Sequence, residues 1–146
     1  MDVAKPPYLV TTDPSRIDFD VVHGFLSHSY WAENIPRETM AKAIEHSTCF
    51  SLFKGDEQIG FARVITDRAT FAYLADVFVL EAHRGAGVGV WFMSVLFAHP
   101  DLQGLRRFQL ATRDAHGLYR KFGFETPKDP SRLMEIVKTA SDLYPK

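Results

Sequence analysis

Three glycines at alternate positions, Gly85, Gly87 and Gly89, form the part of the sequence best suited to bind a phosphate. Glycine allows tight turns, and it lets a ligand approach the backbone amides without obstruction by a Cβ atom. Arg84 directly precedes these glycines and adds a permanent positive charge. The combination of open amides and a cation predicts a cradle for a pyrophosphate-bearing cofactor.

The residues on either side of the glycines have the patterns of a strand and a helix. An apolar run ends at Val79, and after Gly87 apolar residues repeat with the period of a helix. The members of this apolar face are Val88, Trp91, Phe92, Val95 and Leu96. We therefore expect a helix over residues 87–98, whose first amides have no partner within the helix and whose dipole favours an anion.

Two common glycine-rich loops do not match this spacing. Counted from Gly85, the dinucleotide-binding pattern G-x-G-x-x-G needs a glycine where the sequence has Val90, and three predicted strands precede the loop. A P-loop needs Lys followed by Ser or Thr after its glycines, whereas Gly89 is followed by Val90 and Trp91. Neither nucleotide-binding pattern explains the loop.

The pattern R-x-x-G-x-G fits residues 84–89. With the strand before it, this segment resembles the signature of the GCN5-related N-acetyltransferase (GNAT) superfamily. Residues 115–124 are similar to the A-x-x-L-Y-x-x-x-G-F segment of the same family and contain Tyr119. The order of the predicted elements agrees with the family from Leu9 to about Val137, which is nearly the whole chain.

The resemblance implies that acetyl-CoA lies in a V-shaped opening between the strand that ends at Val79 and a parallel strand at residues 107–112. The pyrophosphate is then expected on the loop amides, and the pantetheine arm beside the strand backbone. The implied cofactor contacts are Val77, Phe78, Val79, Arg84, Gly85, Ala86, Gly87, Val88, Gly89 and Thr112. The chain departs from the family at Glu81, where Pro is frequent, and at Thr112, where Asn is frequent. The hydroxyl of Thr112 replaces the amide of that Asn only in part.

Acetyl transfer from a thioester to an amine requires a deprotonated amine, a stabilised oxyanion and a protonated leaving thiol. A backbone amide of residues 77–79 is suited to stabilise the oxyanion. By resemblance Tyr119 is the general acid, and its phenol is protonated at neutral pH. Asp76, Glu33 and His116 are the candidates for the general base, and a chain of water molecules is the alternative to them.

Aromatic residues are the candidates for the walls of the acceptor pocket. Tyr30 and Trp31 lie in a connector between two predicted helices, and Phe71 and Tyr73 lie in the strand that leads to the loop. Core packing explains Phe71 and Tyr73 equally well. If they face the pocket, it suits an aromatic or apolar amine better than a strongly basic peptide. The full candidate pocket is Tyr30, Trp31, Phe71, Tyr73, Asp76 and His116.

The sequence predicts an α+β fold in a single domain over residues 1–146. Strand patterns cover residues 8–12, 49–54, 58–66, 70–79, 107–112 and 133–137, and helices are expected from Asp18, from Pro36, over 87–98 and from Asp114. Short turns make the middle three strands an antiparallel meander, whereas the long helical connection makes the next pair parallel. We expect a mixed, mostly antiparallel sheet of about six to seven strands with helices on both faces. Residues 1–7 are expected to be a loose leader, and residues 138–146 a tail.

The composition limits the classes of function. A net charge of −1 provides no basic field for nucleic acid, and no apolar run approaches the 18 residues of a membrane span. The histidine spacing supports no metal site, and the single cysteine, Cys49, is expected to be a buried structural thiol. The chain is therefore expected to be cytoplasmic. A homodimer through exposed sheet edges or the C-terminal strand is compatible with the sequence.

The leading hypothesis is an acetyl-CoA-dependent N-acetyltransferase that acts on the amine of a small molecule or a protein. A non-catalytic CoA-binding sensor or interaction module on the same fold is the second hypothesis, and a nucleotide-binding protein is the third. Tyr119 favours catalysis over the sensor. The sequence leaves the identity of the amine open.

Overall fold

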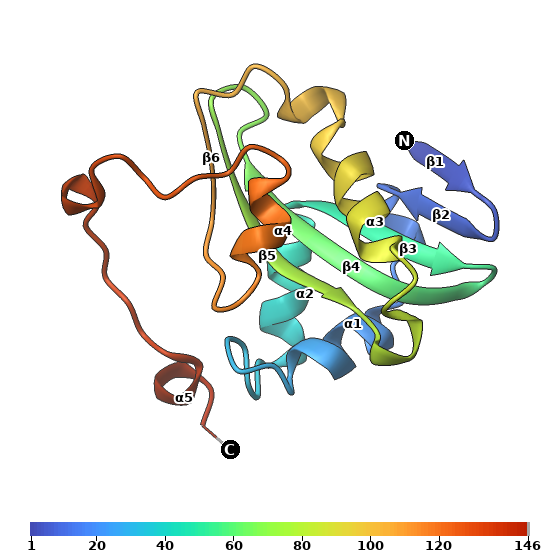
Figure 1. Ribbon diagram of the computed structural model, residues 1–146. Helices are drawn as coiled ribbons and strands as arrows, with labels where there is room; N and C mark the ends of the chain where they lie inside the picture. Colours follow the sequence, from blue (N-terminus) through green and yellow to red (C-terminus); the bar gives the residue numbers. More distant parts are fainter. Residues whose placement is uncertain (146) are drawn as a thin grey trace.

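The computed structural model describes residues 1–145, which contain a six-stranded sheet in the order β1-β2-β3-β4-β5-β6 (Figure 1). The strands are β1 (Asp2–Lys5), β2 (Tyr8–Thr11), β3 (Thr48–Lys54), β4 (Glu57–Thr66), β5 (Phe71–Val79) and β6 (Arg107–Leu110). Strands β1 to β5 are successive antiparallel neighbours, and β6 is parallel to β5. The predicted meander and the predicted parallel pair are both confirmed.

Helices cover both faces of the sheet, as expected (Figure 1). They are α1 (Phe19–Leu26), α2 (Arg37–Glu45), α3 (Val88–Phe97), α4 (His116–Arg120) and a short C-terminal α5 (Ala140–Leu143). Asp18 caps α1, because its carboxylate accepts a hydrogen bond from the amide of Val21. The helices α3 and α4 pack on one apolar cluster of the sheet, and α1 and α2 pack on a second cluster that includes Phe61 and Phe78. Among residues 1–145, no helix is long and apolar enough to cross a membrane.

The parallel pair separates before β5 ends. The paired residues run from Phe71 opposite Arg107 to Leu74 opposite Leu110, whereas β5 continues to Val79. Along residues 75–79 the edge of β5 that faces away from β4 has no strand partner within residues 1–145. A short 3₁₀ turn at Glu81–His83 connects this stretch of free backbone to the glycine loop.

The predicted loose leader at residues 1–7 is wrong. Residues 2–5 form β1, which pairs with β2 through a tight turn at Pro6 and Pro7. The hydroxyl of Thr11 donates a hydrogen bond of 2.6 Å to the Asp2 carboxylate, and the amino group of Met1 donates one of 2.8 Å to Thr12. The two prolines therefore make a hairpin turn, which ties the N-terminus to the sheet.

The predicted last strand at residues 133–137 is also wrong, because this segment is neither helix nor strand. Figure 1 shows that it leaves the body of the molecule. The side chain of Met134 is 96% exposed. The tail at residues 138–146 contains α5, which is capped at Thr139 by reciprocal hydrogen bonds with Asp142. As a result β6 lies at the edge of the sheet.

Candidate functional site

The glycine loop has the backbone geometry of a cradle. Gly85 and Gly87 adopt φ angles of 89° and 76°, in the left-handed region that favours glycine. A Cβ atom placed on either residue would meet nothing within 4 Å. Glycine is therefore favoured at these two positions by the backbone conformation, and not by crowding from neighbouring atoms. The absence of side chains also leaves open space above the loop.

The start of α3 offers hydrogen-bond donors to that space. Gly87 is the N-cap of α3 and contributes no side-chain cap, and its carbonyl accepts the first helical bond, from Trp91. Within residues 1–145 the amides of Val88 and Gly89 have no acceptor. These amides and the helix dipole suit an anion at the surface of the loop.

Arg84 lies between the end of β5 and the loop. Its Nε atom donates a hydrogen bond of 2.7 Å to the carbonyl of Val79, which anchors the side chain at the end of the strand. The two terminal guanidinium nitrogens make no hydrogen bond within residues 1–145. Arg84 therefore places its charge beside the loop with donors available to an anion.

A bulge in the sheet redirects the end of β5. Arg63 of β4 pairs with Ala75, but Phe61, two residues earlier, pairs with Phe78, three residues later. The extra residue on β5 is accommodated at Asp76, which adopts a φ angle of 54°. A positive φ at a non-glycine residue in a strand is uncommon, so the surrounding contacts must hold it in place.

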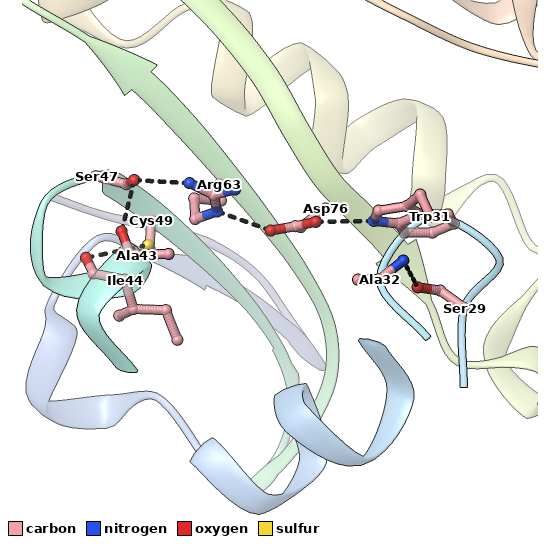
Figure 2. Close-up of polar contacts among 9 residues, drawn as sticks. All are labelled: Ser29, Trp31, Ala32, Ala43, Ile44, Ser47, Cys49, Arg63 and Asp76. Atoms are coloured by element: carbon pink, nitrogen blue, oxygen red, sulfur yellow. Dashed lines mark hydrogen bonds and ion pairs between the residues drawn. The ribbon is translucent and has the colours of Figure 1, made fainter. Parts of the chain in front are cut away.

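Both carboxylate oxygens of Asp76 are engaged (Figure 2). One accepts a hydrogen bond of 2.7 Å from Nε of Arg63, and the other accepts one of 2.8 Å from the indole of Trp31. The Asp76 side chain is 8% exposed, and Arg63 donates a further hydrogen bond to Ser47. Asp76 is thus a structural junction between β4, β5 and the connector before α2.

The connector aromatics are held over this junction. The rings of Tyr30 and Trp31 pack edge to face at 5.1 Å between centroids. The guanidinium of Arg113, from the loop between β6 and α4, lies 3.8 Å from the centroid of Tyr30. The contact of Arg113 with Tyr30 links the connector to the loop before α4. Tyr30 and Trp31 both keep exposed surface, so they remain available to a ligand.

Tyr119 lines a groove of about 460 Å³ together with Tyr73, Thr112 and His116. Its ring is buried and packs edge to face on Phe124 at 6.0 Å. Burial raises the pKa of its phenol above the ordinary value. Within residues 1–145 the hydroxyl of Tyr119 makes no hydrogen bond, yet it is not fully enclosed. It is a protonated group that is free to donate.

Three other residues that the sequence suggested for the site, Phe71, Glu33 and Thr112, have different surroundings. Phe71 is exposed at the start of β5, five residues before Asp76 and therefore about 17 Å away along the strand. Glu33 is exposed in the connector. The hydroxyl of Thr112 accepts a hydrogen bond of 3.0 Å from the amide of Ala115, which stabilises the turn into α4. The structure brings Trp31 and Asp76 together, and separately Tyr73, His116 and Tyr119.

Two residues at the site were missed from the sequence. Arg63 interrupts the apolar run of β4, and a lone cation in such a run indicates a buried acidic partner. Arg113 follows Thr112 in a polar loop, where no local pattern distinguishes it from a surface residue. Its role depends on the position of Tyr30 in the folded chain.

Cys49 lies beside this network but is not part of the chemistry (Figure 2). The side chain is buried, and its thiol lies 3.8 Å from the carbonyl of Ile44. Its pKa is raised to about 12, chiefly because the thiol is buried; the nearby Arg63 lowers the pKa in part, and Asp76 makes a smaller contribution that raises it. A thiol with this pKa is a poor nucleophile at neutral pH.

Comparisons with known proteins agree with this geometry. The acetyltransferase (GNAT) domain model matches residues 45–126. A putative acetyltransferase of Gibberella zeae is 35% identical over 137 residues, which is 78% of this chain and 76% of that protein. A crystal structure of a putative GNAT-family acetyltransferase from Xanthomonas campestris is 50% identical. It superposes with a TM-score of 0.92 over 98% of this chain and 100% of that chain.

A more distant structure, a predicted acetyltransferase with acetyl-CoA from Clostridium acetobutylicum, shares the fold. It is 12% identical and superposes with a TM-score of 0.63 over 89% of this chain and 94% of that chain. The family model and the close relatives define the class, which is that of proteins with the acyl-CoA N-acyltransferase fold. This chain belongs to the GNAT family of acetyltransferases, and acyl transfer is the general activity of that family.

Proposed function

We propose that the protein transfers an acetyl group from acetyl-CoA to a primary amine. The observation that carries this proposal is the unpartnered start of α3. The amides of Val88 and Gly89 have no acceptor within residues 1–145, and they come after Gly85 and Gly87, which have positive φ angles. This loop follows β5, whose outer edge is free along residues 75–79. That sequence of features suits a ligand with a phosphate group followed by an extended, amide-containing arm, as in CoA.

The residues present fit the two parts of CoA. The amides of residues 85–89 and the guanidinium of Arg84 would hold the pyrophosphate, since both provide donors and positive charge. The free backbone of residues 77–79 would pair with the pantetheine amides as a neighbouring strand does. The structure with acetyl-CoA from Clostridium acetobutylicum supports the same ligand for this fold.

Acetyl-CoA supplies the acetyl group already activated as a thioester. A backbone amide of residues 77–79 is positioned by the sheet before the reaction and would donate to the developing oxyanion. Tyr119 would donate its phenolic proton to the leaving sulfur, and its raised pKa keeps that proton on the oxygen at neutral pH. The attacking nitrogen forms its bond to the carbonyl carbon as the carbon–sulfur bond breaks, and its surplus proton leaves through water.

The acceptor would lie against the connector, beside Tyr30 and Trp31. Asp76 is a positioning residue in this proposal, because Arg63 and Trp31 already occupy both of its oxygens. With both oxygens engaged in this way, the carboxylate has no free oxygen to bind a second cation. The acceptor site is therefore better suited to a monoamine with an apolar or aromatic body than to a polyamine.

Replacing Asp76 with asparagine is expected to weaken both folding and acceptor binding. The variant leaves the cation of Arg63 partly buried without a counter-charge, which costs about 3 kcal/mol. Thermal unfolding should then occur roughly 6–12 °C lower, at the usual 2–4 °C per kcal/mol for a chain of this size. The KM for the amine should rise several-fold, because Trp31 loses its fixed orientation, while the KM for acetyl-CoA stays the same.

Trp31→Phe is the matched control, since it keeps an aromatic ring but removes the indole N–H donor together with part of the ring surface. We expect it to raise the KM for the amine while leaving the unfolding temperature within a few degrees of the wild type. Equal KM values for the amine in wild type, Asp76→Asn and Trp31→Phe would contradict the role given to this junction.

Ligand-dependent thermal unfolding tests the proposed function directly. Acetyl-CoA at ~100 times its Kd should stabilise the fold by roughly 2.7 kcal/mol, or about 5–11 °C. A shift with ATP or NAD but none with acetyl-CoA would refute the proposal. A screen of amino acids, polyamines, arylalkylamines and peptides, read by release of free CoA, then separates an enzyme from a sensor. Binding of acetyl-CoA without turnover of any class would favour the sensor.

A further inference from the structure

Arg113, in the loop between β6 and α4, is a cation that has no acidic partner within residues 1–145. Its guanidinium lies over the ring of Tyr30, 3.8 Å from the ring centroid. Asp114 follows it in the chain, but the two side chains form no ion pair. Exposed arginines are common on protein surfaces, so the position of this one in the fold decides what it can bind.

The sheet places Arg113 at the opening between β5 and β6. These two strands run parallel, and their last paired residues are Leu74 and Leu110. Asp76 lies two residues beyond Leu74, and Arg113 lies three residues beyond Leu110. Both residues are therefore at the end of the parallel pair where the two strands separate, one on each side of the opening.

The connector before α2 spans this opening. Tyr30 contacts Arg113 on one side and packs edge to face on Trp31, and the indole of Trp31 donates its hydrogen bond to Asp76 on the other side (Figure 2). Three successive side-chain contacts thus connect the two sides. Arg113 lies within the length of one small molecule from the end of β5, where we place the reacting carbonyl.

Both the backbone and the guanidinium of Arg113 are held in place. The hydrogen bond of 3.0 Å from the amide of Ala115 to the Thr112 hydroxyl closes the turn that contains Arg113. The ring of Tyr30 fixes the guanidinium through one of its faces. The N–H donors of a guanidinium lie in its plane, so they stay available to an anion. A group that is oriented before its ligand arrives loses less entropy on binding.

Arg37 provides a comparison within the same chain. Its guanidinium lies 4.8 Å from the ring centroid of Phe19, and its terminal nitrogen bonds the Asp20 carboxylate at 2.7 Å. Here an arginine contacts a ring and also pairs with a carboxylate of its own chain. Arg113 has the ring contact alone, which leaves its charge and its donors for a ligand.

We propose that Arg113 binds a carboxylate of the acceptor, so that the substrate is a free amino acid with an apolar or aromatic side chain. This inference deepens the proposed function and rests on it. The planar fork of a guanidinium matches the two oxygens of a carboxylate, and one cation balances its single charge. A peptide or protein N-terminus carries no carboxylate beside its amine, so the inference selects a small-molecule acceptor.

The proposed contacts orient the amine for reaction. With the carboxylate on Arg113 and the side chain of the amino acid against Tyr30 and Trp31, the α-amine points into the opening between the strands. Its nitrogen bonds the thioester carbonyl carbon as the carbon–sulfur bond breaks, the sulfur takes the proton of Tyr119, and the surplus proton of the amine passes to water. Arg113 holds the acceptor and transfers no proton.

Paired acceptors test the carboxylate contact. Phenylalanine is compared with phenylalaninamide, and leucine with leucinamide, by kcat/KM from the release of free CoA. The amides keep the shape of the acids and remove the charge. The ratio of acid to amide should fall by about 10- to 100-fold in Arg113→Met, and less in Arg113→Lys, which keeps the charge without the fork. Comparing ratios between proteins cancels the different reactivity of the two amines.

Arg37→Met is the matched control, because its charge is already paired with Asp20, and its ratio should equal that of the wild type. A structural effect of losing Arg113 would lower the rates with acid and amide together and leave the ratio unchanged. Equal ratios in the wild type and Arg113→Met therefore overturn the inference, even where CoA release shows that the protein is an acetyltransferase.

A binding measurement separates this inference from the proposed activity. N-acetylphenylalanine carries the same carboxylate and requires no turnover. Calorimetric titration into the protein saturated with CoA should give a Kd about 10-fold or more lower for the wild type than for Arg113→Met. Equal Kd values overturn the carboxylate site. Tighter binding to the wild type, without release of CoA from acetyl-CoA by any amine, would instead support the site and refute the catalytic proposal.

Discussion

Replacing Tyr119 with phenylalanine should lower kcat by about 100- to 1,000-fold and leave the KM for acetyl-CoA unchanged. The substitution removes the only atom that the proposed mechanism uses to protonate the leaving sulfur. The ring remains, and with it the packing on Phe124. The lost hydroxyl makes no hydrogen bond within residues 1–145, so the unfolding temperature should change little.

Tyr73→Phe is the matched control for this experiment, because Tyr73 lines the same groove and loses the same hydroxyl. We expect its rate to stay within a few-fold of the wild type. The pH profile adds a second readout. Burial raises the pKa of Tyr119, so its acid form should persist to higher pH than that of an exposed tyrosine, and any loss of rate from its ionisation should begin at correspondingly higher pH. Equal kcat values for Tyr119→Phe and the wild type would remove Tyr119 from the mechanism.

Replacing Gly87 with glutamate should abolish CoA binding at ordinary concentrations, with a rise in Kd of about 100-fold or more. The side chain would enter the open space above the loop, where we place the pyrophosphate, and would bring a negative charge to it. The φ angle of 76° adds strain of about 1–2 kcal/mol for a residue with a Cβ atom. Calorimetric titration with CoA measures the affinity, and thermal unfolding without ligand measures the strain.

Gly87→Asn separates these two contributions. Asparagine tolerates the left-handed region and carries no charge, so its effect on CoA affinity should be much smaller than that of glutamate. If glutamate leaves the affinity for CoA at its wild-type value, the loop does not bind the pyrophosphate. If both variants weaken binding equally, steric obstruction alone accounts for the loss.

The central part of the fold follows from local patterns in the sequence. The strands β3 to β5 are joined by short turns, and the helix α3 has a regular apolar face, so their order and direction could be predicted. Asp18 and Gly87 lie at the helix starts where their residue types predict them. These features depend on neighbours in the chain, which is why the sequence reveals them.

The errors concern pairing between distant residues. Residues 133–137 have the alternation of a strand, but whether they pair depends on which edge they reach, and no local pattern encodes that. β1 was missed because it is only four residues long and is followed by two prolines, which favour irregular structure unless a partner strand is present.

The site shows the same division. The loop residues and Tyr119 were predicted from motifs, which are local. The engagement of Asp76 by Arg63 and Trp31 depends on the bulge between β4 and β5, and the contact of Arg113 with Tyr30 joins residues far apart in the sequence. Asp76 was therefore predicted near the site, but its hydrogen-bond partners Arg63 and Trp31 could not be predicted from the sequence.

The burial of Cys49 simplifies the measurement of activity. Free CoA carries a reactive thiol, and its release can be followed continuously with a chromogenic disulfide reagent. With its pKa raised to about 12 by burial, nearly every Cys49 thiol stays protonated at pH 8, and the thiolate is the reactive form. Since Cys49 is the only cysteine of the chain, the folded enzyme contributes almost no background to such an assay. A slow rise in signal without acceptor would thus report either hydrolysis of the thioester or unfolding of the protein.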